Sequence, residues 1–295
     1  GKTKDIESLK SILEKQVKDG EEGYPFENWS KWGGWKNKKL AKGTGFFTKY
    51  KADGKWWLAD PDGYAFFSAG PDCVNVPVDC RVDGIEKWLD WLPDEKEPAY
   101  AEMFSPDRVF KNRKRNAKMF SYAGANLYRV FGEDWYQIWK KMMAGQLMQM
   151  GMNTLGNWSD QRLFENTPIP YVTSLPEFPE TKKKIFRDFP DVLSDEYKEN
   201  AKNNAKALAA RKDDPMMIGY FLRNEPSWAF VDNLVLADEV LYNPERTVCK
   251  EKLIVALKEK YQTVEALNTA WNTKFTDFDD LYQPIRDASA KSEAA

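Results

Sequence analysis

The stretch 216-MMIGYFLRNEPSW-228 decides how the rest of the chain is interpreted. It opens with an apolar run of strand length, 216–222, which has prolines shortly before and after it. A short apolar run between such breakers is typical of a strand buried on both faces, as in a parallel sheet. The run becomes polar abruptly at Arg223, Asn224 and Glu225. The stretch therefore predicts a buried parallel strand with polar side chains at its carboxyl end.

Glu225 is the candidate general acid of this stretch. In barrels of alternating strands and helices, catalytic groups lie at the carboxyl ends of the strands. A carboxylate there, shielded by Phe221 and Trp228, is expected to lose hydration, which raises its pKa and lets it hold a proton near neutral pH. A glutamate after a strand is also commonly a neighbour of a helix N-cap or a solvated loop charge. Position alone leaves both interpretations open.

A strand that ends in Asn224-Glu225-Pro226 resembles the fourth barrel strand of the clan A glycoside hydrolases. The resemblance implies that Glu225 is the acid/base of a retaining hydrolysis and that Asn224 holds the sugar 2-hydroxyl. It also implies that Trp228 is a stacking surface for a sugar ring.

Three further stretches resemble related enzymes. The segment 45–74 has turn signals at 53–54 and 60–63, which predict three short strands joined by two hairpin turns. Its pattern WW-x-x-DP-x-G-x-x-FFS-x-G resembles the entry to the barrel in agarases of glycoside hydrolase family 50. The run NLYRVFGEDW at 126–135 and the NWSD that ends a helix–Gly–strand unit at 157–160 resemble the same enzymes.

The agarase resemblance implies a set of substrate-binding residues. Trp158 is expected to be a sugar platform, with Asn157 beside it at the same strand end. Arg129 is expected either to reach the sugar or to make a structural ion pair. Asp72 is expected on the same barrel face as Glu225, together with Asp160 and Glu177, but none of these occupies the position that the resemblance gives to the nucleophile.

The spacing of apolar residues predicts the architecture. Helical periodicity marks 5–18, 135–150 and 195–211. Helices separate strand-length runs at 65–74, 152–158, 169–175 and 216–222, which we expect to pair in parallel and in that order. The predicted fold is α/β, of the (β/α)8 TIM-barrel type, incomplete at its C-terminal end and with an N-terminal β-hairpin lead-in.

The expected domains follow from these patterns. A run at 251–271 resembles the KY-x-T-x-x-ALN-x-AW insertion after the fourth strand of family 42 β-galactosidases and agarase-like enzymes. The expected parts are an N-terminal helix and Trp-rich arm at 1–44, the first half of the barrel at 45–241 with an insertion at 75–130, a helical insertion at 242–287 and a tail at 288–295.

Composition excludes several kinds of chemistry. The chain has no histidine, which excludes Ser-His-Asp and Cys-His catalysis and His-ligated zinc, and leaves carboxylates as the source of acid/base chemistry. Lys+Arg 44 against Asp+Glu 46 indicates neither nucleic acid nor an anionic membrane as partner, and the basic run 111–118 is interpreted as a solvated helix face. No metal or organic cofactor is implied. Cys73, Cys80 and Cys249 are interpreted as core or loop residues, and a bridge between the first two stays open.

Two interpretations of function remain. The first is a retaining glycoside hydrolase acting on a β-galactoside-containing polysaccharide, with an agarose-like galactan favoured. The second is a non-catalytic carbohydrate-binding half-barrel or degenerate enzyme, because no nucleophile is visible. We expect a C-terminal portion of the same parent chain to supply the remaining strands. We also expect a secreted or periplasmic protein, although the charged start 1–20 lacks a signal-peptide core.

Overall fold

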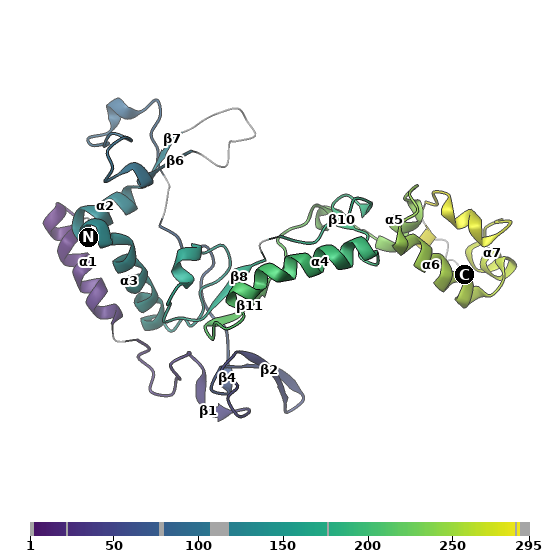
Figure 1. Ribbon diagram of the computed structural model, residues 1–295, viewed down its shortest axis with the longest axis horizontal. Coiled ribbons are helices and arrows are strands. Elements are labelled where there is room, and N and C mark those ends of the chain that lie inside the picture. Colours follow the sequence, from purple (N-terminus) through teal and green to yellow (C-terminus); the bar gives the residue numbers. More distant parts are fainter. Residues whose placement is uncertain are drawn as a thin grey trace. The chain divides into compact units, whose positions relative to one another are not determined.

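The computed structural model describes residues 3–21, 23–76, 80–106, 118–175, 177–286 and 288–289 (Figure 1). It divides into two compact units, unit 1 (Gly1–Thr173 and Asp214–Tyr220) and unit 2 (Ser174–Asp213 and Phe221–Ala295). Most of the basic run, 111–117, lies outside the described residues. The helices of the described part are too short or too polar to cross a bilayer. Cys73, Cys80 and Cys249 are free thiols, which settles the open question of a bridge.

Three helices form one side of unit 1. Helix α1 (Ile6–Gly20) begins where the Asp5 carboxylate accepts a hydrogen bond from Ser8 N at 2.7 Å. It packs against α3 (Trp135–Gln149), which in turn packs against α2 (Tyr122–Phe131). The predicted helices at 5–18 and 135–150 are confirmed.

The contact between α1 and α3 is close enough to require glycine at position 145 of α3. A Cβ placed on Gly145 would lie 2.2 Å from the Cα and 2.3 Å from the carbonyl oxygen of Gly20. Both are backbone atoms, so no side-chain rotation relieves the overlap. The two helices are therefore in backbone contact at this point.

An antiparallel sheet in the order β1-β4-β3-β2 precedes the first parallel segment. Strands β2 (Thr48–Ala52) and β3 (Lys55–Ala59) are joined by Asp53 and Gly54, whose φ angles of 52° and 73° are those of a type I′ hairpin turn. Strand β4 (Tyr64–Phe66) follows the second predicted turn, so both hairpins are confirmed.

Strand β1 (Trp35–Lys39) lies in the Trp- and Gly-rich segment and was not predicted. The buried Asp60 side chain joins this segment to the sheet. It accepts hydrogen bonds from Ser30 Oγ at 2.5 Å and from Tyr64 N at 2.8 Å.

Four segments of the chain lie side by side in parallel, in the predicted order: 69–73, 153–157, β8 (Tyr171–Ser174) and β11 (Met217–Phe221). Their hydrogen bonds run from Asn153 N to Ala69 O (2.8 Å), from Cys73 N to Asn157 O (2.9 Å), from Val172 N to Leu155 O (2.9 Å) and from Tyr171 N to Met216 O (3.0 Å). The described residues form no closed barrel, so the predicted fold class is seen only as this partial ladder.

The prediction that 216–222 is buried on both faces is wrong. The residues of β11 are half-buried or exposed, and the Leu222 side chain is 66 % exposed. A Cβ placed on Gly219 meets no described atom within 4 Å. In the described part of the chain, β11 has β8 on one side and no strand on the other, so nothing covers it as a sheet interior would be covered.

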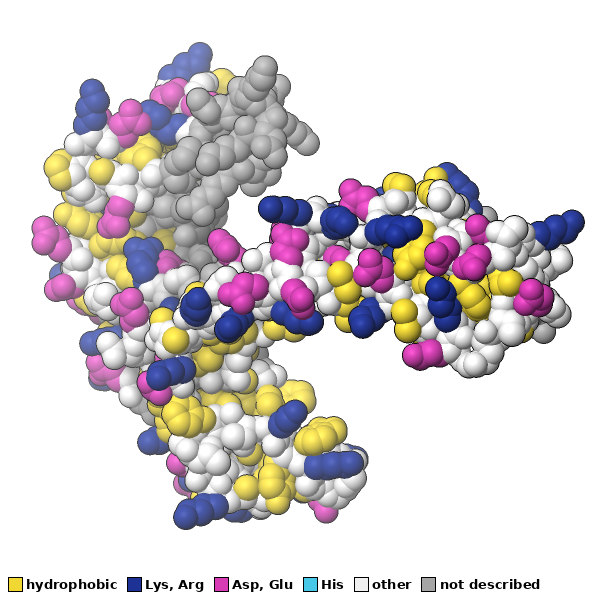
Figure 2. All heavy atoms as spheres, turned by 45° about the vertical axis from the view of Figure 1, so that its right-hand side comes forward, with side chains coloured by type: hydrophobic (Ala, Val, Ile, Leu, Met, Phe, Trp, Pro, Cys, Tyr) yellow, Lys and Arg dark blue, Asp and Glu magenta, His cyan; other side chains and the backbone are white. Residues whose placement is uncertain are grey.

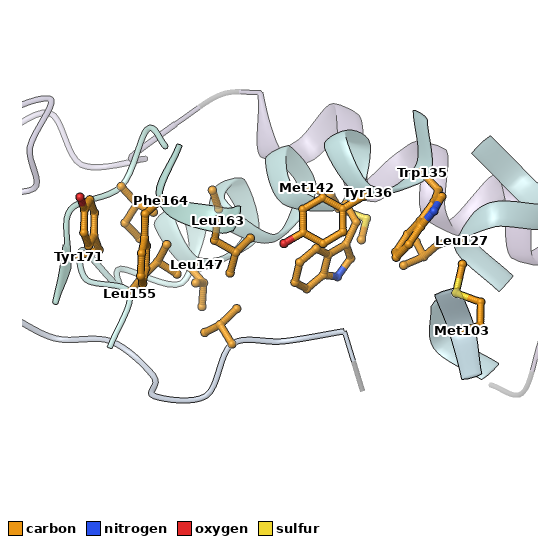
Figure 3. Packing of buried hydrophobic residues seen from close by; sticks show 14 of the residues in the cluster. Met103, Leu127, Trp135, Tyr136, Met142, Leu147, Leu155, Leu163, Phe164 and Tyr171 are labelled. Atoms are coloured by element: carbon orange, nitrogen blue, oxygen red, sulfur yellow. The ribbon is translucent and has the colours of Figure 1, made fainter. Parts of the chain in front are cut away.

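The core of unit 1 lies between α3 and the parallel segments (Figure 3). Tyr171 and Phe164 stack with ring centroids 4.2 Å apart and an interplanar angle of 9°. The methionines of α3 face the core, as expected of side chains that fill irregular gaps. Burial of these large apolar side chains is the main favourable term for unit 1.

Unit 2 combines a hairpin with helices. The hairpin is formed by β9 (Lys184–Phe186) and β10 (Phe189–Pro190). Helix α4 (Asp195–Leu208), within the predicted helix at 195–211, is capped by Ser194, whose side chain accepts a hydrogen bond from Tyr197 N. The other helices are α5 (Leu236–Tyr242), α6 (Val248–Tyr261) and α7 (Val264–Trp271).

The hairpin and the helices of unit 2 are tied together by buried polar groups. The Asp191 carboxylate accepts hydrogen bonds from Val248 N (2.7 Å) and Cys249 N (2.9 Å) at the start of α6. Asn243, which follows α5, donates to the carbonyls of Lys184 and Ile185 in β9 at 2.7 and 3.0 Å. The hairpin is therefore fixed to the helical part.

The remaining elements are short. Strands β5 (Cys80–Arg81), β7 (Lys118–Phe120) and β6 (Phe104–Pro106) form a three-stranded antiparallel sheet in that order. Single 3-10 turns occur at Glu86–Trp88, Ala101–Met103, Gly132–Asp134, Gln161–Phe164, Ala209–Arg211, Ser227–Phe230 and Phe278–Tyr282.

The domain boundaries expected from the sequence stay predictions.

Candidate active site

Unit 1 brings three of the predicted site residues together at the carboxyl ends of its first two parallel segments. Asp72 accepts a hydrogen bond from Asn157 N at 2.8 Å. Gly156 lies directly against this carboxylate, since a Cβ there would be 2.0 Å from Asp72 Oδ1. Trp158 follows in the left-handed region with φ 59°, and its side chain is 45 % exposed. Asp72 thus holds the turn that presents Trp158 to solvent.

The other predicted residues of unit 1 have different surroundings. The Asn157 side chain is buried beneath the same turn. Arg129 lies on α2, with its guanidinium 5.0 Å from the centre of the Trp91 ring and Nη1 3.5 Å from Asn126 Oδ1. Its described contacts are therefore an aromatic ring and an amide. The substrate-binding roles of Asn157 and Arg129 stay predictions.

The predicted acid/base lies in unit 2, directly after β11. Asn224 and Glu225 are both exposed, and Glu225 has φ 39°, in the left-handed region that residues other than glycine rarely occupy. The expectation that Phe221 and Trp228 shield Glu225 is wrong. Phe221 is itself 37 % exposed, and the Trp228 ring packs edge-on against Phe189, with centroids 5.2 Å apart and an interplanar angle of 71°.

One carboxylate, Asp188, holds the turn that carries Glu225. Asp188 lies in the turn of the β9–β10 hairpin and pairs with the Arg223 guanidinium. It accepts hydrogen bonds from Ser227 Oγ (2.6 Å), Ser227 N (3.1 Å) and Trp228 N (3.2 Å). Arg187 adds a bond from Nη1 to the Ser227 carbonyl at 2.8 Å.

The charge of Asp188 is stabilised by these partners. Partial burial raises the pKa of the carboxyl group, but the hydrogen bonds from Ser227 and Trp228 and the positive charge of Arg223 lower it by more. The net effect brings the pKa of Asp188 to about 2. Asp188 is therefore ionised near neutral pH.

A cavity of about 300 Å³ lies beside this turn, within unit 2. Aromatic and aliphatic side chains form most of its lining, and Trp228 and Arg223 belong to it. The Arg223 guanidinium lies 4.9 Å from the centre of the Phe178 ring, and its Nη1 is buried without a hydrogen-bond partner among the described residues. A mostly apolar cavity with one convergent polar group suits a ligand that offers a flat apolar face and an oxygen acceptor.

The described residues contain no cluster of acidic or cysteine side chains with the geometry of a metal site. The Asp188 interaction could not be found from sequence motifs, because 35 to 40 residues separate Asp188 from its partners. The turn residues Arg187 and Asp188 between two phenylalanines are the only local signal, and they predict a hairpin turn and nothing more.

Comparisons with known proteins agree with the motifs. The glycoside hydrolase family 42 model, beta-galactosidase, matches residues 179–294. Beta-agarase B of Vibrio sp. (strain JT0107) is 28 % identical over 276 residues, which are 82 % of this chain and 29 % of that protein. Beta-agarase A of the same strain is 26 % identical over 274 residues, 81 % of this chain and 27 % of that protein.

Solved structures show the same fold. A crystal structure of an agarase superposes with a TM-score of 0.76 at 23 % identity, covering 99 % of this chain and 47 % of that one. The structure of an exo-beta-agarase superposes with a TM-score of 0.71 at 24 % identity, covering 100 % of this chain and 48 % of that one. The chain thus spans less than a third of the curated relatives and about half of the solved ones. Within that span, the comparisons confirm its resemblance to the agarase-type glycoside hydrolases.

Proposed function

We propose that the chain carries the acid/base part of a glycoside hydrolase that acts on a β-galactoside-containing polysaccharide, with an agarose-like galactan as substrate. The observation that supports this most is the placement of Glu225. It follows β11, the last of four parallel segments in order, with Asn224 before it and Pro226 after it. The names of the relatives, beta-agarase and beta-galactosidase, indicate the substrate class.

In the proposed mechanism Glu225 donates a proton to the glycosidic oxygen as the leaving sugar departs. In a retaining enzyme a second carboxylate, about 5 Å from the first, attacks the anomeric carbon, and the first carboxylate then takes a proton from the incoming water. Asn224 binds the 2-hydroxyl of the sugar. Trp158 and Trp228 offer ring faces to the apolar faces of sugars. The second carboxylate is left unassigned.

The test is Glu225→Gln in the longest natural protein that carries this sequence. Turnover of agarose oligosaccharides should fall roughly 10²–10⁴-fold, the usual contribution of a general acid. A 2,4-dinitrophenyl β-galactoside needs no proton for departure, so its first step should suffer much less, and azide should restore the second step. Glu199→Gln is the matched control, because Glu199 is an exposed carboxylate on α4 of the same unit that pairs with Lys202, and it should change turnover of neither substrate.

Equal loss on both substrates, or full activity of Glu225→Gln, would remove Glu225 from the mechanism. Proton NMR of the first-formed product tests the retaining outcome, because retention gives the β-anomer before mutarotation. First formation of the α-anomer would show inversion instead.

A second candidate function is carbohydrate binding without hydrolysis. The exposure of Glu225 favours it, since catalytic groups commonly act in sites from which water is excluded. Binding of agarose oligosaccharides by the wild-type protein without release of reducing ends would establish this alternative.

A further inference from the structure

We infer that Asp188 is the positioning residue of the Glu225 turn, an inference that rests on the proposed function of Glu225. Asp188 does not touch the reacting atoms. It binds the Arg223 side chain on one side of Glu225 and the Ser227 and Trp228 backbone amides on the other, and thereby sets where the carboxyl group of Glu225 points.

The first argument is that contacts from other residues must stabilise the backbone conformation of the turn at Glu225. Glu225 has φ 39°, a conformation that costs energy for a residue with a Cβ and persists only where neighbouring contacts enforce it. The segment between β11 and the 3-10 turn Ser227–Phe230 has no regular structure. Glu225 is exposed, so burial of its own side chain does not enforce the conformation.

The second argument is that Asp188 binds both flanks of Glu225. On the N-terminal side, the Arg223 guanidinium pairs with Asp188 Oδ2. On the C-terminal side, Ser227 N also donates to Oδ2, at 3.1 Å, while Ser227 Oγ (2.6 Å) and Trp228 N (3.2 Å) donate to Oδ1. One carboxylate therefore closes a loop of chain whose middle residue is Glu225.

The third argument is that the hairpin which carries Asp188 is itself held in position by other parts of unit 2. It lies in the turn of the β9–β10 hairpin, and Asp191 at the end of that hairpin accepts hydrogen bonds from Val248 N and Cys249 N of α6. Phe189, next to Asp188, packs edge-on against Trp228. The hairpin that bears Asp188 is thus anchored to the helical part of unit 2 and to the turn itself.

The experiment compares Asp188→Ala and Asp188→Asn with two references in the longest natural protein that carries this sequence. Glu225→Gln is the reference for loss of the acid. Asp195→Asn is the matched control, because Asp195 is an exposed carboxylate of the same unit that pairs with Lys198 and lies outside the turn. The measurements are amide hydrogen exchange, and kcat and KM on agarose oligosaccharides and on a 2,4-dinitrophenyl β-galactoside.

Asp188→Ala should speed exchange of the Ser227 and Trp228 amides by about 10-fold or more, because both lose their acceptor, while α6 amides keep their protection. It should lower kcat on agarose oligosaccharides by roughly 10²-fold with little change in KM, since misplacement of a catalytic group by about 1 Å has that effect. The loss on the activated galactoside should be much smaller, as for Glu225→Gln. Asp188→Asn keeps one acceptor oxygen and should fall between wild type and Asp188→Ala.

Unchanged exchange at Ser227 and Trp228 in Asp188→Ala would overturn the inference. So would an equal loss of kcat on both substrates, or a loss of the same size in Asp195→Asn. If Glu225→Gln keeps full activity, the proposed function fails by itself. The exchange measurements then still decide whether Asp188 holds the turn.

Discussion

A single carboxylate at position 188 joins a hairpin to a turn by an ion pair and several hydrogen bonds. Charge-assisted bonds of this kind are stronger than neutral ones, and they depend on ionisation. The stability of unit 2 should therefore depend on pH through Asp188. Its pKa is lowered from 3.8 to about 2 by the bonds from Ser227 and Trp228 and by Arg223, which together outweigh the effect of partial burial.

At the residue scale, Asp188→Asn should remove a pH-dependent part of the stability. A carboxyl group with a lowered folded-state pKa contributes stability above its unfolded pKa, and this contribution is lost as the pH falls through the folded pKa. The wild type should exceed the variant by about 1–2 kcal/mol at pH 6, after allowance for solvent screening. The difference should shrink between pH 4 and pH 2. Urea unfolding at pH 6, 4 and 3 measures it, and a constant difference across that range would contradict it.

Sequence patterns predict local features of the residues better than their surroundings. Asn224, Glu225 and Trp158 were found from motifs, and the structure places each at the carboxyl end of a parallel segment. The exposure of Glu225 could not be predicted, because the Trp228 ring that was expected to shield it packs against Phe189, which is remote in sequence. Asp188 was missed for the same reason.

At the element scale, the contact of α1 with α3 is a backbone-to-backbone constraint between two helices. Gly20 and Gly145 meet backbone to backbone, so any Cβ at Gly145 must separate the helices. Alanine gains about 1 kcal/mol of helix propensity over glycine, but overpacking of this kind typically costs 1–3 kcal/mol. The steric cost is expected to prevail because neither helix can relieve it by rotating a side chain.

Gly145→Ala should therefore destabilise unit 1 by up to about 2 kcal/mol in spite of its better helix propensity. Chemical denaturation followed by tryptophan fluorescence measures the change. Gly219→Ala is the control, since a Cβ there meets no described atom within 4 Å, and its effect should stay within about 0.5 kcal/mol. A stabilised Gly145→Ala would show that the helices move apart at no cost.

Among the elements, periodicity predicted the helices α1, α3 and α4, and turn chemistry predicted both hairpins. These depend on residues that are close in sequence. Strand β1 was missed because its sequence, WKNKK, lacks the alternation of apolar and polar residues that is typical of a strand. It pairs with β4 through backbone hydrogen bonds, which do not depend on the pattern of side chains. The parallel order was predicted correctly, but the burial of β11 was not, since burial depends on neighbours that the described chain does not supply.

At the scale of the whole molecule, the charge distribution favours a neutral ligand. The chain carries 44 basic and 46 acidic residues, and Figure 2 shows both kinds interspersed with hydrophobic side chains on the face it presents. The described residues of that face form no single-sign patch that would attract a polyanion.

Binding of neutral agarose oligosaccharides should therefore change little, by less than about 3-fold in Kd, between 50 and 500 mM salt, because few counterions are displaced. Isothermal titration calorimetry measures this, with a sulfated galactan of equal length as the matched comparison. A steep fall of affinity with salt for the neutral ligand, or binding of glucans but not galactans, would contradict the substrate class.

Unit 1 takes its residues from two separate stretches of the chain, Gly1–Thr173 and Asp214–Tyr220, with part of unit 2 encoded between them. No single cut in the gene isolates it. A fragment that stops after Thr173 encodes most of β8 without β11, and leaves the backbone N–H of Tyr171 without its acceptor, the Met216 carbonyl. A shuffled gene in which 214–220 follows 1–173 through a short linker would encode every residue of unit 1. The boundaries for dissecting this protein are therefore set by spatial neighbours and differ from any division along the sequence.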